Sequence, residues 1–240
     1  MKLTDKIEVL NEDCMVVMSR YPDKYFDLAV VDPPYGEDDA VETNKSNSKN
    51  KATKRNEYRQ FNNVKPDSNY WLGLKRVSKN QIVWGGNYFG LSGGVLAWDK
   101  NGTAFGEGEV AICSTHNSVR FFEYTWNGMI QQNMKNKEER FHPTQKPVAL
   151  YDWIFKNYAI CPACENKGWI WLTMGKQTDC PKCKGEIPKI LDTHGGSMSS
   201  VISADKAGLE MVCCELDKEY FDKAVDRFNK YKSQNVLEFK

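Results

Sequence analysis

Along the chain, short apolar runs typical of strands alternate with apolar residues at helical spacing, and this pattern predicts an α/β protein. Short apolar runs bounded by polar or Gly-rich turns predict strands at residues 27–31 and, between residues 81 and 126, at QIVW, GVLAW, VAICS and FFEYTW. Two later runs, KIL and MVCC, predict further strands at residues 189–191 and 211–214. These runs are short enough for strands and carry the β-branched and aromatic residues that strands favour.

Spacing of i, i+3, i+4 and i+7 predicts two helices. One follows HPTQKP, with an apolar face of Pro147, Leu150, Tyr151, Ile154, Phe155 and Tyr158. The other carries Tyr220, Phe221, Ala224, Val225 and Phe228 on one face. From residue 189 the order is strand, Gly-rich turn, helix, strand and acid, as in a nucleotide-binding half of a doubly wound sheet. The sequence therefore predicts an α/β fold with a doubly wound, Rossmann-like sheet.

Two segments interrupt this pattern. Residues 36–66 are polar and rich in Lys and Asn, and they predict a long mobile loop. Residues 161–183 hold two CxxC pairs and predict a small insert. The expected organisation is a main domain whose first part is residues 1–160, the insert at 161–183, and the second part of the main domain at 184–240.

Charge and composition narrow the class of protein only a little. Of the 240 residues 40% are hydrophobic, and 33 Lys and Arg stand against 32 Asp and Glu, so any basic surface must be local. One candidate is the loop at 44–59, which holds six cations: Lys45, Lys49, Lys51, Lys54, Arg55 and Arg59. It is either a phosphate-contacting loop or a solvated linker. The start MKLTDKIEVL lacks the apolar core of a signal peptide, and no apolar run reaches membrane-spanning length. We expect a cytoplasmic protein with no membrane partner.

The motif Asp32-Pro33-Pro34-Tyr35 directly follows the strand at 27–31. Open α/β sheets bind their ligands at this end of a strand. An aromatic amine is a poor nucleophile because its lone pair is delocalised into the ring, and a carboxylate that accepts its N–H localises that pair. The fixed prolines hold a carbonyl as a second acceptor, and Tyr35 offers a stacking face for an extruded base. The alternative interpretation is an ordinary proline turn.

Three further segments have the chemistry of a nucleoside cofactor site. The turn Asp192-Thr193-His194-Gly195-Gly196-Ser197 lets the backbone approach a ligand closely, and Glu215 follows the next strand, where an acid suits ribose hydroxyls. Thr144 and Lys146, at the start of the helix after HPTQKP, are suited to a carboxylate. Taken singly, these segments also fit a plain β–α turn, a surface acid and a capped helix start.

The insert predicts a metal site. Cys161, Cys164, Cys180 and Cys183 have the spacing C-x2-C-x15-C-x2-C, in which each CxxC turn presents two thiolates to one ion. Four protein ligands leave no open position, so we expect a structural zinc ion in a zinc-ribbon-like insert. The alternative is a set of four unligated cysteines. Lys167, Lys176 and Lys182 of the insert, with Lys184 directly after it, suggest a second role in contacting DNA.

The order of DPPY, WGGNYF, VLAWDK, HPTQKP, DTHGGS and CELDKEYFDKAVDRF resembles the β class of DNA amino-methyltransferases, in which the catalytic motif precedes the cofactor loop. The resemblance covers most of the chain outside residues 36–66 and 161–183. It implies catalysis by Asp32, Pro33, Pro34 and Tyr35. It implies an S-adenosyl-L-methionine (SAM) site lined by Asp13, Cys14, Thr144, Lys146, Asp192, Gly195, Gly196, Ser197 and Glu215.

The cofactor loop departs from the family pattern D-P-F-x-G-S-G-T, because Thr193-His194 replaces Pro-Phe and Met198 replaces the last Gly. The implied reaction is methylation of N6 of a flipped-out adenine in DNA by a monomer or homodimer. N4 of cytosine presents the same group, but cytosine members of the family tend to have Ser in place of Asp32. RNA as the substrate, and an inactive nucleic-acid-binding module, stay open as alternatives.

Overall fold

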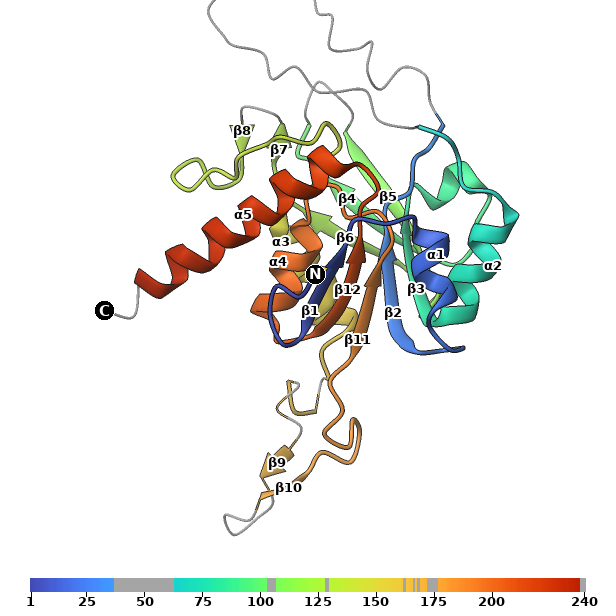
Figure 1. Cartoon of the computed structure of the whole chain (residues 1–240), viewed down its shortest axis with the longest axis vertical. Helices are drawn as coiled ribbons and strands as arrows, with labels where there is room; N and C mark the ends of the chain where they lie inside the picture. The colour runs from blue at the N-terminus through green and yellow to red at the C-terminus, as the bar shows by residue number, and fades with distance from the viewer. Residues whose placement is uncertain are drawn as a thin grey trace, which may run out of the picture.

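A single large sheet forms the centre of the chain. In the computed structural model we describe residues 1–36, 63–102, 107–127, 130–161, 163–165, 167, 169–171 and 177–237. The strands of the large sheet are β1 (Ile7–Leu10), β2 (Phe26–Val31), β3 (Ser78–Trp84), β4 (Gly94–Asp99), β5 (Gly108–Cys113), β6 (Val119–Glu123), β11 (Lys189–Asp192) and β12 (Glu210–Cys214). They lie in the order β1-β12-β11-β2-β3-β5-β4-β6 (Figure 1). Two small hairpins pair β7 (Trp126–Asn127) with β8 (Ile130–Gln131), and β9 (Trp169–Trp171) with β10 (Gln177–Asp179).

The direction of the strands fixes where a ligand can bind. Strands β1, β12, β11, β2 and β3 run parallel, and β5 runs antiparallel to both of its neighbours. From β11 the chain passes through α4 (Ser199–Lys206) to β12, whereas from β2 it passes through α2 (Ser68–Val77) to β3. The connections therefore diverge between β11 and β2. In a doubly wound sheet this is the point at which ligands bind, beyond the carboxyl ends of the strands.

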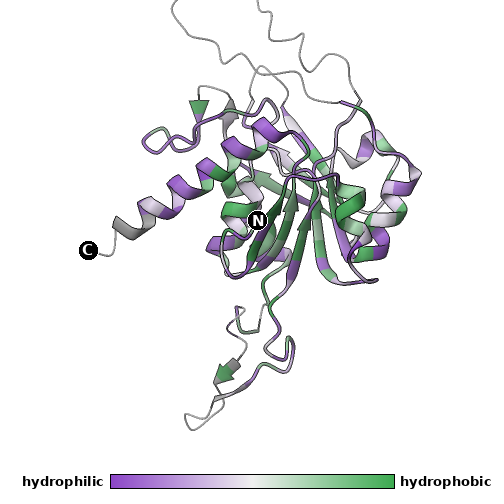
Figure 2. Cartoon of the chain, in the orientation of Figure 1, coloured by the Kyte–Doolittle hydropathy of each residue, from purple (hydrophilic) through white to green (hydrophobic). Residues whose placement is uncertain are grey.

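Helices cover both faces of the sheet. On one face α4 packs with α3 (Val148–Tyr158) and α5 (Lys218–Leu237), and this core includes Leu28 and Val30. On the other face α1 (Cys14–Ser19) and α2 form a second core with Ala29 and Val31. Because β2 is buried on both faces, it is continuously apolar from residue 28 to residue 31, as Figure 2 shows for the central strands. The prediction of a doubly wound α/β sheet with a small insert is confirmed.

Most predicted elements are present, and one needs correction. The predicted helices are α3 and α5, and the predicted strands match β2 to β6, β11 and β12. The run FFEYTW, however, is not one strand, because β6 ends at Glu123. Trp126 belongs to a separate strand, β7, and its indole N–H donates to the carbonyl of Gln145 at 2.9 Å. Within the described residues no helix is both long and apolar enough to cross a membrane.

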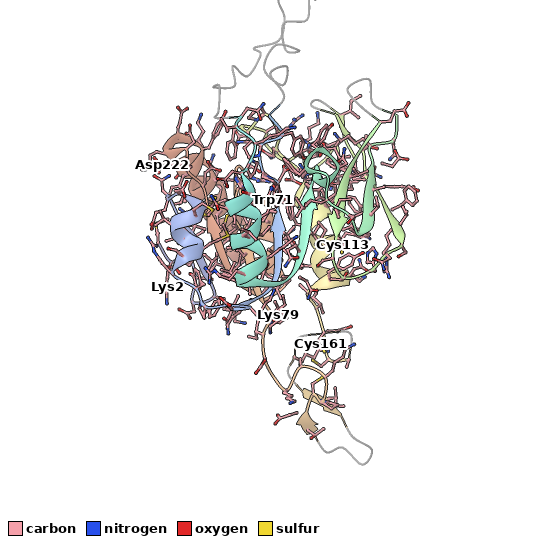
Figure 3. All side chains as sticks on the ribbon, turned by 90° about the vertical axis from the view of Figure 1, so that its right-hand side faces the viewer. Lys2, Trp71, Lys79, Cys113, Cys161 and Asp222 are labelled. Atoms are coloured by element: carbon pink, nitrogen blue, oxygen red, sulfur yellow. The ribbon has the colours of Figure 1, made fainter. Side chains whose placement is uncertain are left out.

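The insert leaves the main body at the edge where the parallel strands begin. It connects the end of α3 to the start of β11. In Figures 1 and 3 it extends outward from this edge, on the side away from the carboxyl ends of the strands. Residues 37–62, which include all six cations of the predicted basic loop, lie outside the described residues, as does Lys176.

Candidate functional site

Three acids and a glycine lie at the carboxyl ends of four adjacent strands. Glu215 follows β12, Asp192 ends β11, Asp32 follows β2, and Gly85 follows β3. The register places Asp192 beside Cys213 and Leu191 beside Ala29, so the three acids lie at one edge of the sheet. This edge includes the point where the chain connections diverge.

Asp32 is held by two donors from different parts of the chain. The hydroxyl of Tyr35 donates to Oδ1 at 2.6 Å, and the ammonium of Lys146 donates to Oδ2. Burial, and next the charge of Asp32, raise the pKa of Tyr35, so its hydroxyl stays protonated as a donor. The intervening Pro33 and Pro34 lie in the irregular segment that continues from β2.

The ring of Tyr35 lies in an aromatic layer. It stacks on Tyr88 with 4.9 Å between the ring centroids and 18° between the planes. Gly85 lies against the ring and has φ +64°, and a Cβ there would lie 2.2 Å from a carbon of Tyr35. Only glycine fits both the backbone angle and the close approach. The WGGNYF segment therefore positions the tyrosine of the DPPY motif.

Lys146 belongs to a charge cluster that includes an acid absent from the sequence predictions, Glu109 of β5. The ammonium of Lys146 also contacts Glu109 Oε2 at 3.1 Å, and Lys100 holds Oε1 at 2.5 Å. Burial opposes charge on Lys146, but Asp32 and Glu109 raise its pKa well above the usual value. Burial also opposes charge on Glu109, whose pKa Lys146 and Lys100 lower to about 2. The cluster thus pairs two cations with two carboxylates.

The Gly-rich turn is tied to both neighbouring acids. Asp192 is buried and accepts from the Ser200 hydroxyl at 2.6 Å and from the backbone N–H of His194 at 3.0 Å. Burial raises the pKa of Asp192 to about 7. Gly196, at φ +50°, donates its N–H to Glu215 Oε2 at 2.7 Å, and the backbone N–H of Asp217 donates to Oε1 at 2.8 Å. The turn and the acid after β12 therefore form one unit.

Met198 stands where the resembling family has glycine. It keeps the left-handed conformation, with φ 55° and ψ 35°, and its side chain is fully buried. A non-glycine residue in this region costs about 1–2 kcal/mol, whereas burying a methionine side chain contributes about 1.5–3 kcal/mol. Burial of the side chain thus offsets the cost of this backbone conformation.

The HPTQKP segment passes beside the turn. The Ser199 hydroxyl donates to the carbonyl of Lys146 at 2.7 Å, and a Cβ on Gly196 would lie 3.4 Å from the ring of His142. Thr144 is exposed, with its hydroxyl 3.2 Å from Nδ1 of His142, whereas the side chain of Lys146 is only 4% exposed. The sequence predicts that Thr144 and Lys146 together bind a carboxylate of the ligand. In the structure the side chain of Thr144 lies at the surface, whereas the ammonium of Lys146 contacts carboxylates of the protein.

The NEDC segment lies on the other side of Glu215. Asp13 caps α1 and accepts from the backbone N–H groups of Met15 and Val16 at 2.8 and 3.3 Å. The side-chain amide of Asn11 donates to the carbonyl of Glu215 at 2.8 Å. Burial raises the pKa of Cys14 to about 11, so its thiol is neutral. Asp13 and Cys14 thus lie at the same edge of the sheet as the other predicted cofactor residues.

Arg227 of α5 is a second residue that the sequence analysis missed. Its guanidinium donates to the carbonyl of Ser197 at 2.8 Å and to the hydroxyl of Ser199 at 2.9 Å, and it pairs with Glu138 at 2.5 Å. These contacts from α5 fix the end of the Gly-rich turn. The sequence offers a signal that could have identified Glu109, because it is a lone acid in an otherwise apolar strand. It offers none for Arg227, which is indistinguishable from the other surface charges of α5.

The four cysteines of the insert converge on one point. Their Sγ atoms lie within 4.8 Å of one another, with 3.8 Å between Cys161 and Cys180 and 3.4 Å between Cys164 and Cys183. A tetrahedral zinc site with Zn–S bonds near 2.3 Å requires sulfur atoms about 3.8 Å apart. The donor set and its spacing therefore fit a zinc ion.

The backbone around the cysteines repeats the same turn twice. Glu165 and Lys184 follow the two CxxC pairs, and each has φ 51°. Their N–H groups donate to the carbonyls of Cys161 and Cys180 at 2.8 and 2.7 Å. The backbone N–H of Cys183 lowers the pKa of the Cys180 thiol to about 7. Two equivalent turns presenting thiols to one point are typical of zinc knuckles.

Comparisons with known proteins bear on the fold. No family model and no curated protein matches the sequence. The cytosine-N4-specific PvuII DNA methyltransferase matches with a TM-score of 0.53 at 11% identity, over 94% of this chain and 87% of that chain. A Thermus thermophilus protein, TTHA0409, described as a candidate DNA modification methylase and solved with SAM, matches with a TM-score of 0.50 at 12% identity, over 93% of each chain. The chain therefore has the fold of DNA methyltransferases.

Proposed function

We propose that this chain, which has the fold of DNA methyltransferases, transfers a methyl group from SAM to N6 of adenine in DNA. The observation that carries the proposal is the adjacency of Asp32, Asp192 and Glu215 on neighbouring strands at one edge of the sheet. One strand end has the residues to hold an amino group, and the next two have those to hold a nucleoside. Transfer between them needs this arrangement, because it is a direct displacement.

SAM supplies a methyl group activated by its sulfonium. Asp32 accepts an N–H of the target amino group, and the Pro33 carbonyl accepts the other. With SAM bound, the amino nitrogen would take the methyl group and S-adenosylhomocysteine would leave, while the proton released from nitrogen would pass to Asp32 or to water. Tyr35, stacked on Tyr88, presents an aromatic face to the extruded base. Catalysis arises from orientation and from the carboxylate hydrogen bond.

In this proposal the cofactor lies between the Gly-rich turn and the segments that flank it. Asp192, Gly195, Gly196 and Ser197 approach it from the turn, Glu215 from the end of β12, Asp13 and Cys14 from the NEDC segment, and Thr144 from HPTQKP. The sequence also predicts Lys146 in this set, but its buried ammonium contacts Asp32 and Glu109 instead. Glu215 already accepts two backbone N–H groups, and its remaining lone pairs are available to ribose hydroxyls.

Adenine is favoured over cytosine by Asp32, where related cytosine enzymes tend to have Ser. The match to a cytosine-N4-specific enzyme makes N4 of cytosine the second candidate. The test is incubation of the protein with SAM and unmethylated DNA, followed by mass spectrometry of the nucleosides, with RNA in parallel. N6-methyladenine in DNA is the expected product. N4-methylcytosine alone, or methylated RNA alone, would replace the proposed substrate, and no methylation of either would contradict the proposed activity.

We also propose that the insert binds one structural zinc ion through Cys161, Cys164, Cys180 and Cys183. The four thiols leave no ligand position for substrate, and the insert joins the sheet at the edge opposite Asp32. Since α3 alone spans about 16 Å between these edges, zinc has no part in methyl transfer. The proposed role is to fasten the end of α3 to the start of β11. The same distance argues against the lysines of the insert contacting DNA near the target base.

A Glu215→Gln substitution should weaken SAM binding. The amide replaces an acceptor oxygen with an NH2 group, so one of the bonds to the turn, or the proposed bond to the ribose, is lost. We expect a loss of about 1–3 kcal/mol in binding free energy, measured by calorimetry. Glu210→Gln is the matched control, because Glu210 begins the same strand at the opposite edge. Equal affinities in wild type and Glu215→Gln would reduce Glu215 to a scaffold role.

A further inference from the structure

The buried ammonium of Lys146 competes for the Asp32 carboxylate, which the proposed reaction needs as an acceptor. Tyr35 takes Oδ1 of Asp32 and Lys146 takes Oδ2, so both carboxylate oxygens already have an N–H or O–H donor. In the proposed reaction the amino group of the target base must also donate to this carboxylate. Lys146 is therefore directed at the group with which the substrate has to pair.

We propose that Lys146 is a resident stand-in for the amino group of the target base, and that Glu109 is the positioning residue that holds Lys146 when the base enters. The inference rests on the proposed amino-methylation. In the free enzyme Lys146 bridges Asp32 and Glu109, and with the base bound it pairs with Glu109 alone.

Of the two donors on Asp32, Lys146 is the exchangeable one. Tyr35 is fixed by its stacking on Tyr88 and by the close fit of Gly85 against its ring. Lys146 already has a second acceptor at 3.1 Å in Glu109, so it can leave Asp32 without losing every partner. The Trp84 ring, whose centroid lies 5.4 Å from the ammonium, favours the cation in this same region.

Glu109 is fixed where this exchange needs it. Lys100 holds its other oxygen at 2.5 Å and itself lies over the ring of Trp98, with 4.8 Å to the centroid. The carboxylate is thus anchored on one side and open to Lys146 on the other. Without Glu109, displacement of Lys146 by the base would leave a buried ammonium with no carboxylate, and such a charge is strongly unfavourable. Glu109 therefore makes the entry of the base a replacement of one donor by another.

The test compares Glu109→Gln with the charge-balanced double variant Glu109→Gln/Lys146→Met. Methyl transfer to a DNA oligonucleotide is measured at saturating SAM, with SAM affinity measured separately by calorimetry. In Glu109→Gln we expect kcat/KM for DNA to fall by about tenfold or more, because Lys146 stays on Asp32. The affinity for SAM should change by less than about twofold, because in this proposal neither Glu109 nor Lys146 contacts SAM. Glu107→Gln, an exposed acid just before β5, is the matched control.

The double variant separates exchange from simple damage. It removes the competing ammonium together with its acceptor, so it should recover most of the activity that Glu109→Gln loses. A double variant as impaired as Glu109→Gln would overturn the inference, as would a Glu109→Gln enzyme with normal kcat/KM. Weakened SAM binding in Glu109→Gln with unchanged KM for DNA would also overturn it, because Lys146 and Glu109 would then serve the cofactor.

A measurement on the wild-type protein avoids any dependence on how the variants fold. The nitrogen resonance of the Lys146 ammonium should shift when an adenine-containing oligonucleotide is added to the SAM-bound protein. An oligonucleotide with purine, which lacks the amino group, in place of adenine should leave it unchanged. Equal shifts with both oligonucleotides would refute the exchange. A wild-type protein that methylates no nucleic acid contradicts the proposed function itself, whereas an active wild type with an unaffected Glu109→Gln contradicts only this inference.

Discussion

Asp32→Ala should lower methyl transfer by about 10²–10⁴-fold, the range for removal of a group that acts on the reacting atoms. The carboxylate is the proposed acceptor for the amino group, and in this variant nothing else at that position localises the nitrogen lone pair. Binding of SAM should survive, because the proposed cofactor contacts come from the turn after β11 and from Glu215. Transfer of tritiated methyl groups to DNA, with calorimetry for the cofactor, measures both quantities.

The control for this variant is Asp23→Ala, which removes an aspartate whose side chain is 76% exposed and pairs with Arg76 at the surface. Such pairs contribute little, so activity should stay near the wild-type value. Asp32→Asn adds a second comparison, since it keeps the shape but replaces one acceptor oxygen with a donor. An Asp32→Ala enzyme with near wild-type turnover would remove Asp32 from the mechanism.

The second large effect concerns the insert. The purified protein should contain one zinc ion per chain, and Cys180→Ser should lose it. Because thiolate ligation contributes directly to folding, we expect the melting temperature to fall by about 5–10 °C. Methyl transfer measured well below that temperature should persist, since the thiols and Asp32 lie at opposite edges of the sheet. Elemental analysis and a thermal scan, each with and without a chelator, provide the measurements.

Lys182→Ala is the matched control for the metal site, because Lys182 lies between Cys180 and Cys183, is exposed and offers no thiol. It should keep both the zinc content and the melting temperature. Protein prepared without chelators that contains no metal would contradict the zinc site. A Cys180→Ser variant that folds normally but transfers no methyl groups would contradict the separation of the two sites.

The sequence predicted elements well where one physical signal was strong. Strand β2 contains an apolar run that is followed by Asp32 and two prolines, and α3 carries five apolar residues at helical spacing. Helix α1 was missed because six residues are too few to show a period. Helix α2 was missed although Tyr70, Leu74 and Val77 have helical spacing, because Gly73 and the polar segment before it hide the pattern.

The candidate site was predictable as a set of strand ends, but its contacts were not. Acids that follow parallel strands must share one edge of the sheet, so the nearness of Asp32, Asp192 and Glu215 follows from the pattern. The pairing of Lys146 with Asp32 joins residues 114 positions apart and depends on how α3 packs against the sheet. Glu109 enters the cluster because β5 runs antiparallel beside β3, and no local signal in the sequence specifies that order.

The insert enters and leaves the main body at neighbouring points, after α3 and before β11, on the side of the sheet away from the acids. This junction is therefore a natural site for exchanging modules. A foreign domain with closely spaced termini, grafted in place of residues 161–183, would lie at the edge of the sheet opposite Asp32, Asp192 and Glu215. A module attached at this junction can therefore be changed, by evolution or by protein engineering, while the acids at the opposite edge of the sheet are retained.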